Sequence, residues 1–161
     1  MSANQDSMSD AIAAIKSRDH NRLRLALKEI PDVIFGDSIL LRLAVSERES
    51  DSVRILLGLG AKPNESIMES AARSFSLDII SALTDAEPSL IEASGYRVLQ
   101  ILFVRVAYRN DTSPLNVWFN GLTNRFGKEH DKPICEALSK VGKAEAATWL
   151  TVRLLHRPVK V

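Results

Sequence analysis

The fold of this chain is decided by residues 52–64, which read SVRILLGLGAKPN. Four of these residues fall at i, i+3, i+4 and i+7, a spacing that places apolar side chains on one face of a helix: Val53, Leu56, Leu57 and Gly60. Gly60 stands where a left-handed C-terminal cap ends such a helix, and Pro63 prevents the helix from resuming. The stretch therefore predicts the end of an amphipathic helix, a glycine stop and a tight turn into the next element.

Similar units recur along the chain, and a recurrence of this kind indicates a repeat architecture. The first helix of each candidate repeat is anchored on an alanine, with neighbouring anchors 27 to 36 residues apart: Ala14, Ala44, Ala71, Ala107 and Ala137. An apolar residue stands twelve positions after each anchor: Ala26, Leu56, Leu83, Phe119 and Trp149. Pro31 and Pro88 mark the same turn in the first and third repeats. Because no segment alternates as a strand would, we predict an all-α fold of ten helices in five antiparallel pairs.

Length and composition place the chain among ordinary globular proteins. Its 161 residues are 45% hydrophobic and 25% charged, and 21 basic residues nearly cancel 20 acidic ones. That balance argues against nucleic-acid binding through bulk charge, and a single cysteine, Cys135, excludes an internal disulfide and fits a reducing compartment. The apolar run 98–108 is too short and too polar to span a bilayer, and residues 1–8 do not resemble a signal peptide. We expect an intracellular, cytoplasmic and soluble protein, although a protein delivered into a host cell would look the same.

The expected domain organisation is simple. We expect a disordered tail over residues 1–8, a helical repeat domain over residues 9–155 whose first helix is capped by Ser9, and a frayed tail over residues 156–161. A buried position such as Leu56 should then be sensitive to truncation.

Residues 53–64 resemble the second helix and turn of an ankyrin repeat, Leu-Leu-x-x-Gly-Ala-Asp-Pro-Asn, with Lys62 in place of the family's Asp. The family's Thr-Pro-Leu-His opening is absent, and its nearest counterparts begin at Ser38 and Ser66. The usual Gly-His between paired helices is replaced by Glu49-Ser50 in the second repeat and Phe75-Ser76 in the third. The resemblance implies a short ankyrin-like solenoid that binds a protein partner through a concave face and loops, without catalysis. The departures leave open another helical-pair solenoid or an unrelated helical bundle.

Arginine and aromatic side chains mark the expected partner site. Near the end of the fourth first-helix, Arg105 and Arg109 are one turn apart with Tyr108 beside them, and Arg73 and Phe75 occupy the comparable end of the third. Stacked repeats would join these residues into one patch of the types found at interface hot spots. The competing interpretation places Tyr108 and Phe75 in the core. A second cluster in the loop 121–132 could meet an acidic partner surface or phosphate groups: Arg125, Phe126, Lys128 and Lys132.

Catalytic and metal chemistry is not indicated. The three histidines, His20, His130 and His156, are far apart in the sequence, and we place the first two in solvated turns. Cys135 follows a predicted helix start, but no base can be named for it, so we interpret it as a small buried apolar residue. The two glycines of the opening stretch lie at a helix end and form no phosphate loop. We therefore expect no enzyme activity, no cofactor and no metal.

The sequence leaves three functions open. The first is a protein-interaction module, such as an adaptor, an inhibitor or immunity-type protein, or an effector. The alternative is a small-molecule-binding or catalytic helical domain with a pocket under the fourth repeat, which a water-accessible cavity with convergent polar groups would indicate; its expected lining is Tyr108, Trp118 and Phe119. A third, which the net charge disfavours, is nucleic-acid contact through four basic residues: Arg125, Lys128, Arg153 and Arg157. Self-association is left open because the end helices expose uncovered faces.

Overall fold

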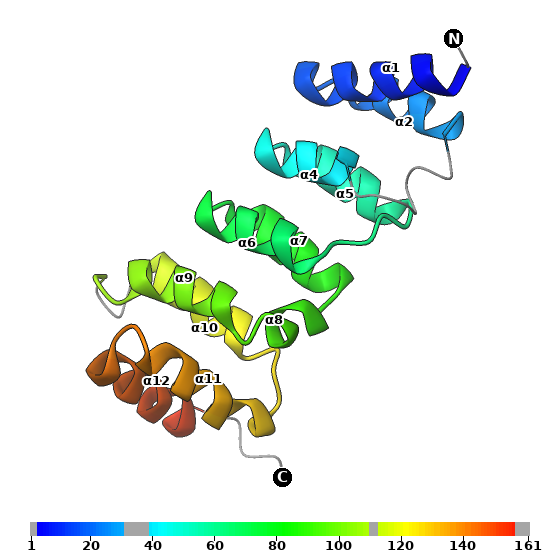
Figure 1. Ribbon diagram of the computed structural model, residues 1–161. Helices are drawn as coiled ribbons and strands as arrows, with labels where there is room; N and C mark the ends of the chain where they lie inside the picture. The colour runs from blue at the N-terminus through cyan, green and yellow to red at the C-terminus, as the bar shows by residue number, and fades with distance from the viewer. Residues whose placement is uncertain (1–2, 31–38, 110–112, 157–161) are drawn as a thin grey trace. The chain divides into compact units, whose positions relative to one another are not determined.

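The computed structural model describes residues 3–30, 39–109 and 113–156, and within these ranges the chain is helical and contains no strand (Figure 1). This confirms the all-α prediction. Predictions that fall on Pro31, Ser38 and Arg157 lie outside the described residues. None of the described helices is long and apolar enough to cross a membrane. Contacts divide the chain into two compact units, Met1–Leu90 and Ile91–Val161, each of which we describe by itself.

The described residues of the first unit form three successive helix pairs. Helix α1 (Ala3–Ser17) packs on α2 (His20–Lys28), α4 (Ile39–Ser46) on α5 (Ser50–Gly58), and α6 (Glu65–Arg73) on α7 (Leu77–Ala86). The first helices of the pairs contact one another in the order α1, α4, α6, and the second helices in the order α2, α5, α7. Each pair therefore buries its apolar side chains both within itself and against the next pair.

The turn between paired helices has the same backbone in all three pairs. In these three pairs, the residue four positions after the anchor alanine has a left-handed backbone conformation. Its φ is 58° at Arg18, 55° at Arg48 and 54° at Phe75. The next amide donates to the carbonyl of the anchor at 2.9 to 3.1 Å, which is the hydrogen bond of a Schellman turn. The second-pair equivalent of Phe75-Ser76 is therefore Arg48-Glu49, and the alignment on Glu49-Ser50 is wrong by one residue.

Residues 52–64 fold as predicted. Gly60 has φ of 98°, and the amide of Ala61 donates to the carbonyl of Leu56 at 3.0 Å, so the glycine forms the expected left-handed stop. The side chain of Asn64 then accepts a hydrogen bond from the amide of Ile67 at 2.9 Å, and α6 begins at the following residue. Local turn chemistry thus fixes both the end of α5 and the beginning of α6.

The expected disordered tail over residues 1–8 is wrong for residues 3–8, because α1 begins at Ala3 rather than beside Ser9. No proline interrupts this segment, and Asp6 lies in the first turn, where the helix dipole favours a negative charge. Polar residues with adequate helix propensity therefore extend the helix beyond its buried part. At the other end of the described chain, α12 stops at Leu155, as expected.

The second unit contains two further pairs. Helix α9 (Arg97–Val106) packs on α10 (Pro114–Thr123), α11 (Asp131–Ser139) packs on α12 (Lys143–Leu155), and α11 also contacts α9. The 3-10 turn η1 (Lys128–His130) leads into α11, and the short helix α8 (Ser89–Ala93) contains the boundary with the first unit. Helix α10 begins at Pro114, whose fixed backbone angle suits a first helical residue, and the Ser113 hydroxyl accepts from the amide of Asn116 at 3.2 Å.

The anchor assigned to the fourth repeat is wrong. Ala107 is the half-buried C-cap of α9 and is not a core residue of that helix. The buried residues of α9 reproduce the spacing of the buried residues of α6, and this match makes Leu102 the equivalent of Ala71. The prediction of the anchor failed because we looked for an alanine at the anchor position of each repeat. In the longer and more apolar α9, leucine occupies that position.

Candidate functional site

The end of α9 exposes an aromatic residue between arginines. Tyr108 is 88% exposed and Val104 is 43% exposed, and both Arg105 and Arg109 are exposed. We call these four residues the α9 patch. The interpretation that places Tyr108 in the core is therefore wrong.

The other two residues of the predicted patch lie in the first unit. Arg73 is the last residue of α6 and is exposed, with its guanidinium 3.6 Å from the carboxylate of Glu69. Phe75 lies in the left-handed turn that follows and is half-buried. Because Arg73 and Phe75 belong to one compact unit and the α9 patch to the other, we treat them as two surfaces.

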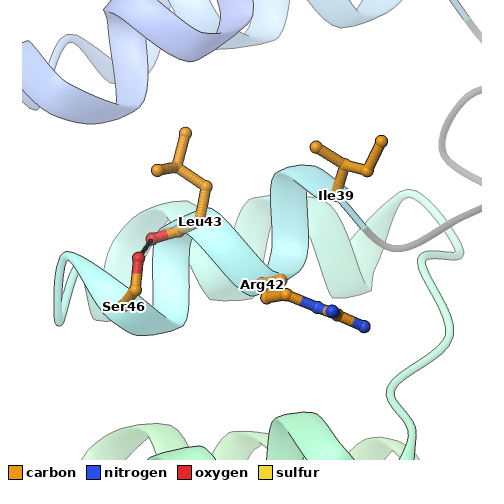
Figure 2. A pocket seen from close by; sticks show the side chains of 4 residues that line it. All are labelled: Ile39, Arg42, Leu43 and Ser46. Atoms are coloured by element: carbon orange, nitrogen blue, oxygen red, sulfur yellow. Dashed lines mark hydrogen bonds between the residues drawn. The ribbon is translucent and has the colours of Figure 1, made fainter.

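The first unit has two shallow depressions on neighbouring helices. One measures about 380 Å³ and is lined by a single stripe of α4 (Figure 2): Ile39, Arg42, Leu43 and Ser46. The side chains of Ile39 and Leu43 project from the same side of the helix. The other measures about 550 Å³ and is lined by α6: Glu65, Ser66, Glu69, Ser70 and Arg73. Because α4 contacts α6, we call the two stripes together the α4–α6 face.

The contribution of α4 to this face was not predicted from the sequence. Ile39 is 49% exposed and Leu43 is half-buried, although both occur in a helix rich in core residues. An apolar residue in such a helix is expected to be buried, and only the position of the neighbouring pair determines which apolar side chains remain accessible.

The predicted basic cluster is only partly available at the surface. Arg125 is exposed, whereas Phe126 is half-buried with its ring 5.7 Å from that of His130. Arg153 is 7% exposed, because its guanidinium forms an ion pair with Asp131 at 2.5 Å and donates to the carbonyl of Phe126 at 3.0 Å. The assignment of Arg153 to nucleic-acid contact is therefore wrong, and the hypothesis loses one of its four basic residues.

The expectation that His130 lies in a solvated turn is also wrong. Its Nδ1 shares a hydrogen bond with the hydroxyl of Tyr96 at 2.7 Å, and its side chain is only 20% exposed. Burial, followed by the nearby charges of Glu92 and Glu129, raises the pKa of the Tyr96 hydroxyl. This pair connects the beginning of α9 to η1, so we interpret it as a structural link within the second unit.

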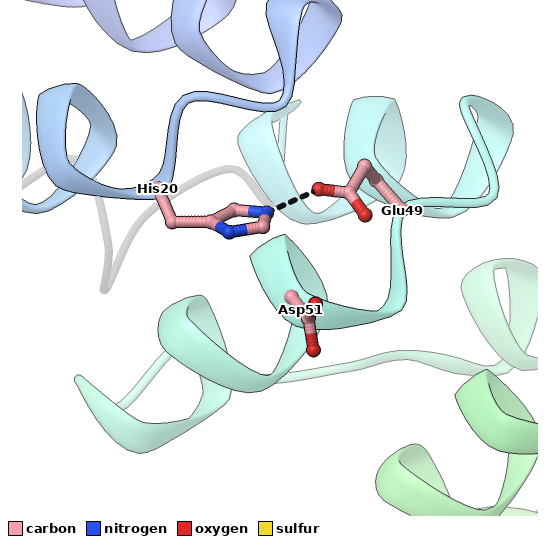
Figure 3. A group of neighbouring side chains, drawn as sticks. All are labelled: His20, Glu49 and Asp51. Carbon is pink, nitrogen blue, oxygen red and sulfur yellow. Dashed lines mark hydrogen bonds and ion pairs between the residues drawn. The ribbon is translucent and has the colours of Figure 1, made fainter.

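His20 likewise does not lie in a solvated turn. Its Nε2 is 2.6 Å from Oε2 of Glu49, a residue that is 8% exposed and lies at the N-cap of α5 (Figure 3). Asp51, in the first turn of α5, completes a group of three potential metal ligands. The contact between His20 and Glu49 joins the first helix pair of the unit to the second.

A cavity of about 570 Å³ lies between α9, α10 and α12 of the second unit. Its apolar lining includes Phe103, Val106 and Val152, and its polar lining includes the following side chains: Arg109, Asn116, Asn120, Glu145, Thr148 and His156. Trp149, which is 7% exposed, also lines it, and its indole N–H has no hydrogen-bond partner among the described residues.

The aromatic lining that we expected for this pocket is wrong. Tyr108 and Trp118 do not belong to the lining, and Phe119 is fully buried with its ring 5.7 Å from that of Phe103. The error arose because the lining was taken from the fourth repeat alone, whereas α12 of the fifth repeat forms one wall of the cavity.

Cys135 is half-buried at the contact of α11 with α12. Its thiol donates a weak hydrogen bond to the carbonyl of Ala146, with Sγ 3.7 Å from the oxygen. This position agrees with its interpretation as a packing residue.

Comparisons of the chain with protein-family models, with curated proteins and with solved structures give no match.

Proposed function

We propose that this chain is a non-enzymatic, cytoplasmic protein-interaction module, built as a divergent ankyrin-like solenoid, that binds a protein partner through the outward residues of its first helices. The observation that carries the proposal is Tyr108, which is 88% exposed at the end of α9 with exposed arginines on either side. Tyrosine and arginine are over-represented among the residues that dominate interface energetics.

The α9 patch has the composition of an interface centre. The ring of Tyr108 offers a large apolar area that loses little side-chain entropy on binding. Arg105 and Arg109 provide planar donors that can pair with partner carboxylates in a bidentate manner. Val104 adds a further exposed apolar group on the same helix. The favoured partner is therefore a protein surface that presents a pocket for an aromatic ring and acidic residues around it.

The α4–α6 face supports the same function in the first unit. Ile39 and Leu43 form an apolar stripe beside Arg42, and the neighbouring helix α6 carries the charged residues Arg73 and Glu69. An apolar centre with a charged border is the usual anatomy of a protein interface. Phe75, Arg125 and Phe126 complete the set of proposed contact residues on the loops that follow α6 and α10.

The proposal is tested by partner capture followed by affinity measurement. A protein captured from a lysate of the source cell, and retained at moderate salt, is identified by mass spectrometry. Tyr108→Ala and Arg105→Glu/Arg109→Glu should then each weaken binding about tenfold or more, as expected for hot-spot residues. Matched changes on second helices, Val117→Ala and Arg54→Glu, should leave the affinity unchanged because these exposed residues lie outside both proposed surfaces.

An affinity that is insensitive to the α9 variants but falls on Arg54→Glu would contradict the site assignment. The α4–α6 face is tested separately with Ile39→Asp, so that loss at one surface is distinguished from loss at the other.

A second candidate function, small-molecule binding, is favoured by the cavity between α9, α10 and α12. Its volume lies within the range of ligand pockets, which combine apolar walls with a few polar groups. A suitable ligand has an aromatic body for the walls, an acceptor for the indole N–H of Trp149 and an anionic group for Arg109.

The fluorescent anion 8-anilinonaphthalene-1-sulfonate is a probe with this chemistry. In a Trp118→Phe background, Trp149 is the one remaining tryptophan, and its emission should fall as the probe saturates the cavity. Val152→Glu should weaken saturation about tenfold by placing a charge in the wall, whereas Val117→Glu, an exposed change outside the cavity, should not. Equal binding by both variants would exclude this cavity as the site.

A further inference from the structure

A histidine and two carboxylates from two helix pairs of the first unit converge at one point (Figure 3). The potential ligand atoms of His20, Glu49 and Asp51 all lie within 4.8 Å of one another. His20 is the first residue of α2, whereas Glu49 is the N-cap of α5 and Asp51 lies in its first turn. We propose that these three side chains bind a divalent cation of the zinc class and thereby tie the first helix pair to the second.

The charge of Glu49 is the first argument for a cation. Its carboxylate is largely buried, and burial of a charge is costly unless the charge is paired. Within the described part of the chain it pairs with the imidazole of His20 at 2.6 Å and with the hydroxyl of Ser52 at 3.2 Å, and no lysine or arginine accompanies it. Both contacts are made by Oε2. A divalent cation would supply the missing positive charge.

The geometry admits an ion after a small adjustment. Zinc binds nitrogen and oxygen at roughly 2.0–2.2 Å, so two ligand atoms of a tetrahedral site lie about 3.3 Å apart. His20 Nε2 and Glu49 Oε2 would therefore separate from their present 2.6 Å, and the proton between them would leave Nε2 for Nδ1 or for solvent. Asp51, whose side chain is 59% exposed, would turn toward the ion from its contact with Arg54. Water would occupy the fourth position.

The donor set selects the class of cation. An imidazole suits zinc and its first-row neighbours, whereas magnesium and calcium prefer oxygen ligands alone. Ser52, which is fully buried, donates its hydroxyl to Glu49 and holds the carboxylate in place, as outer-shell partners of metal ligands do. The exposed side of the site, formed by His20 and Asp51, provides a path for the ion to enter.

The experiment is a calorimetric titration of the full chain with Zn²⁺, with Co²⁺ absorption as a report of the coordination geometry. We expect one equivalent of Zn²⁺ to bind and to raise the thermal midpoint. Asp51→Asn, a change at an exposed position, should weaken binding about tenfold, and Ser52→Ala should weaken it by about 10–100-fold. His20→Ala should abolish it. The control is His156→Ala, which removes an exposed histidine from the second unit and should change nothing.

Glu49→Gln separates ligation from folding, because it keeps the size of the side chain and can still hydrogen-bond to His20. Loss of Zn²⁺ binding in this variant, with helix content unchanged by circular dichroism, would support the site. No saturable Zn²⁺ binding by the unaltered chain would overturn the proposal, and so would binding that persists in both His20→Ala and Glu49→Gln.

Discussion

Replacement of Arg153 by leucine should lower the free energy of unfolding by about 3–5 kcal/mol, the usual cost of removing one partner from a buried ion pair. The side chains of Arg153 and Asp131 are only 4% and 9% exposed, and their charged atoms are 2.5 Å apart. The substitution leaves the carboxylate of Asp131 buried without the guanidinium and removes the donor to the carbonyl of Phe126. It also removes a cation that lies 5.4 Å from the ring centre of Trp149.

Urea denaturation followed by tryptophan fluorescence measures this effect, since both tryptophans, Trp118 and Trp149, belong to the second unit. The double variant Asp131→Leu/Arg153→Leu should recover most of the lost stability, because replacing both members of a buried pair by apolar groups is often neutral. The exposed change Arg109→Leu should alter stability by less than about 0.5 kcal/mol. A double variant as unstable as Arg153→Leu would show that the broken ion pair does not cause the loss of stability.

Truncation of Leu56 to alanine should cost about 2–5 kcal/mol, the range for removal of a large aliphatic side chain from a packed core. Leu56 is 1% exposed, and its helix α5 contacts α2, α4 and α7. The cavity left by the substitution would therefore lie among several helices, which cannot all move inward to fill it.

Circular dichroism during urea denaturation is the suitable measurement for Leu56→Ala, because it also reports the helices of the first unit. The matched control is Leu25→Ala in α2, since Leu25 is 63% exposed and should contribute less than about 0.5 kcal/mol. Equal losses from Leu56→Ala and Leu25→Ala would contradict the burial pattern on which the fold description rests.

The parts of the fold that were predicted correctly depend on neighbours in sequence. Gly60 marks the end of α5 through its own turn chemistry, which is independent of the rest of the molecule. All five apolar residues twelve positions after the anchors are at most 8% exposed, including the one that followed the misplaced anchor Ala107: Ala26, Leu56, Leu83, Phe119 and Trp149. Helical periodicity determines which residues can share a face, so the buried face of each helix could be predicted without the structure.

The candidate sites were harder to predict because they depend on distant pairs and on exposure. His20 meets Glu49 across 29 residues, and Tyr96 meets His130 across 34. No local pattern indicates such a pair, and so both histidines were placed in solvent. Exposure could not be decided from the sequence, because a tyrosine such as Tyr108 has the same residue type whether it is buried or exposed. Only packing against neighbouring helices decides between these outcomes.

The left-handed turns of the first unit have a consequence for how its internal symmetry can be recognised. Arg18 and Arg48 are arginines whereas Phe75 is aromatic and uncharged, yet the three φ angles agree within a few degrees. Each accepts a conformation that costs an L-residue roughly 1–2 kcal/mol and that glycine would adopt freely. The third copy is therefore related to the first two through dihedral angles and hydrogen-bond registry, although its residue type differs. Superposition of backbone torsions would align Phe75 with Arg18 and Arg48, where a substitution matrix assigns phenylalanine and arginine no similarity.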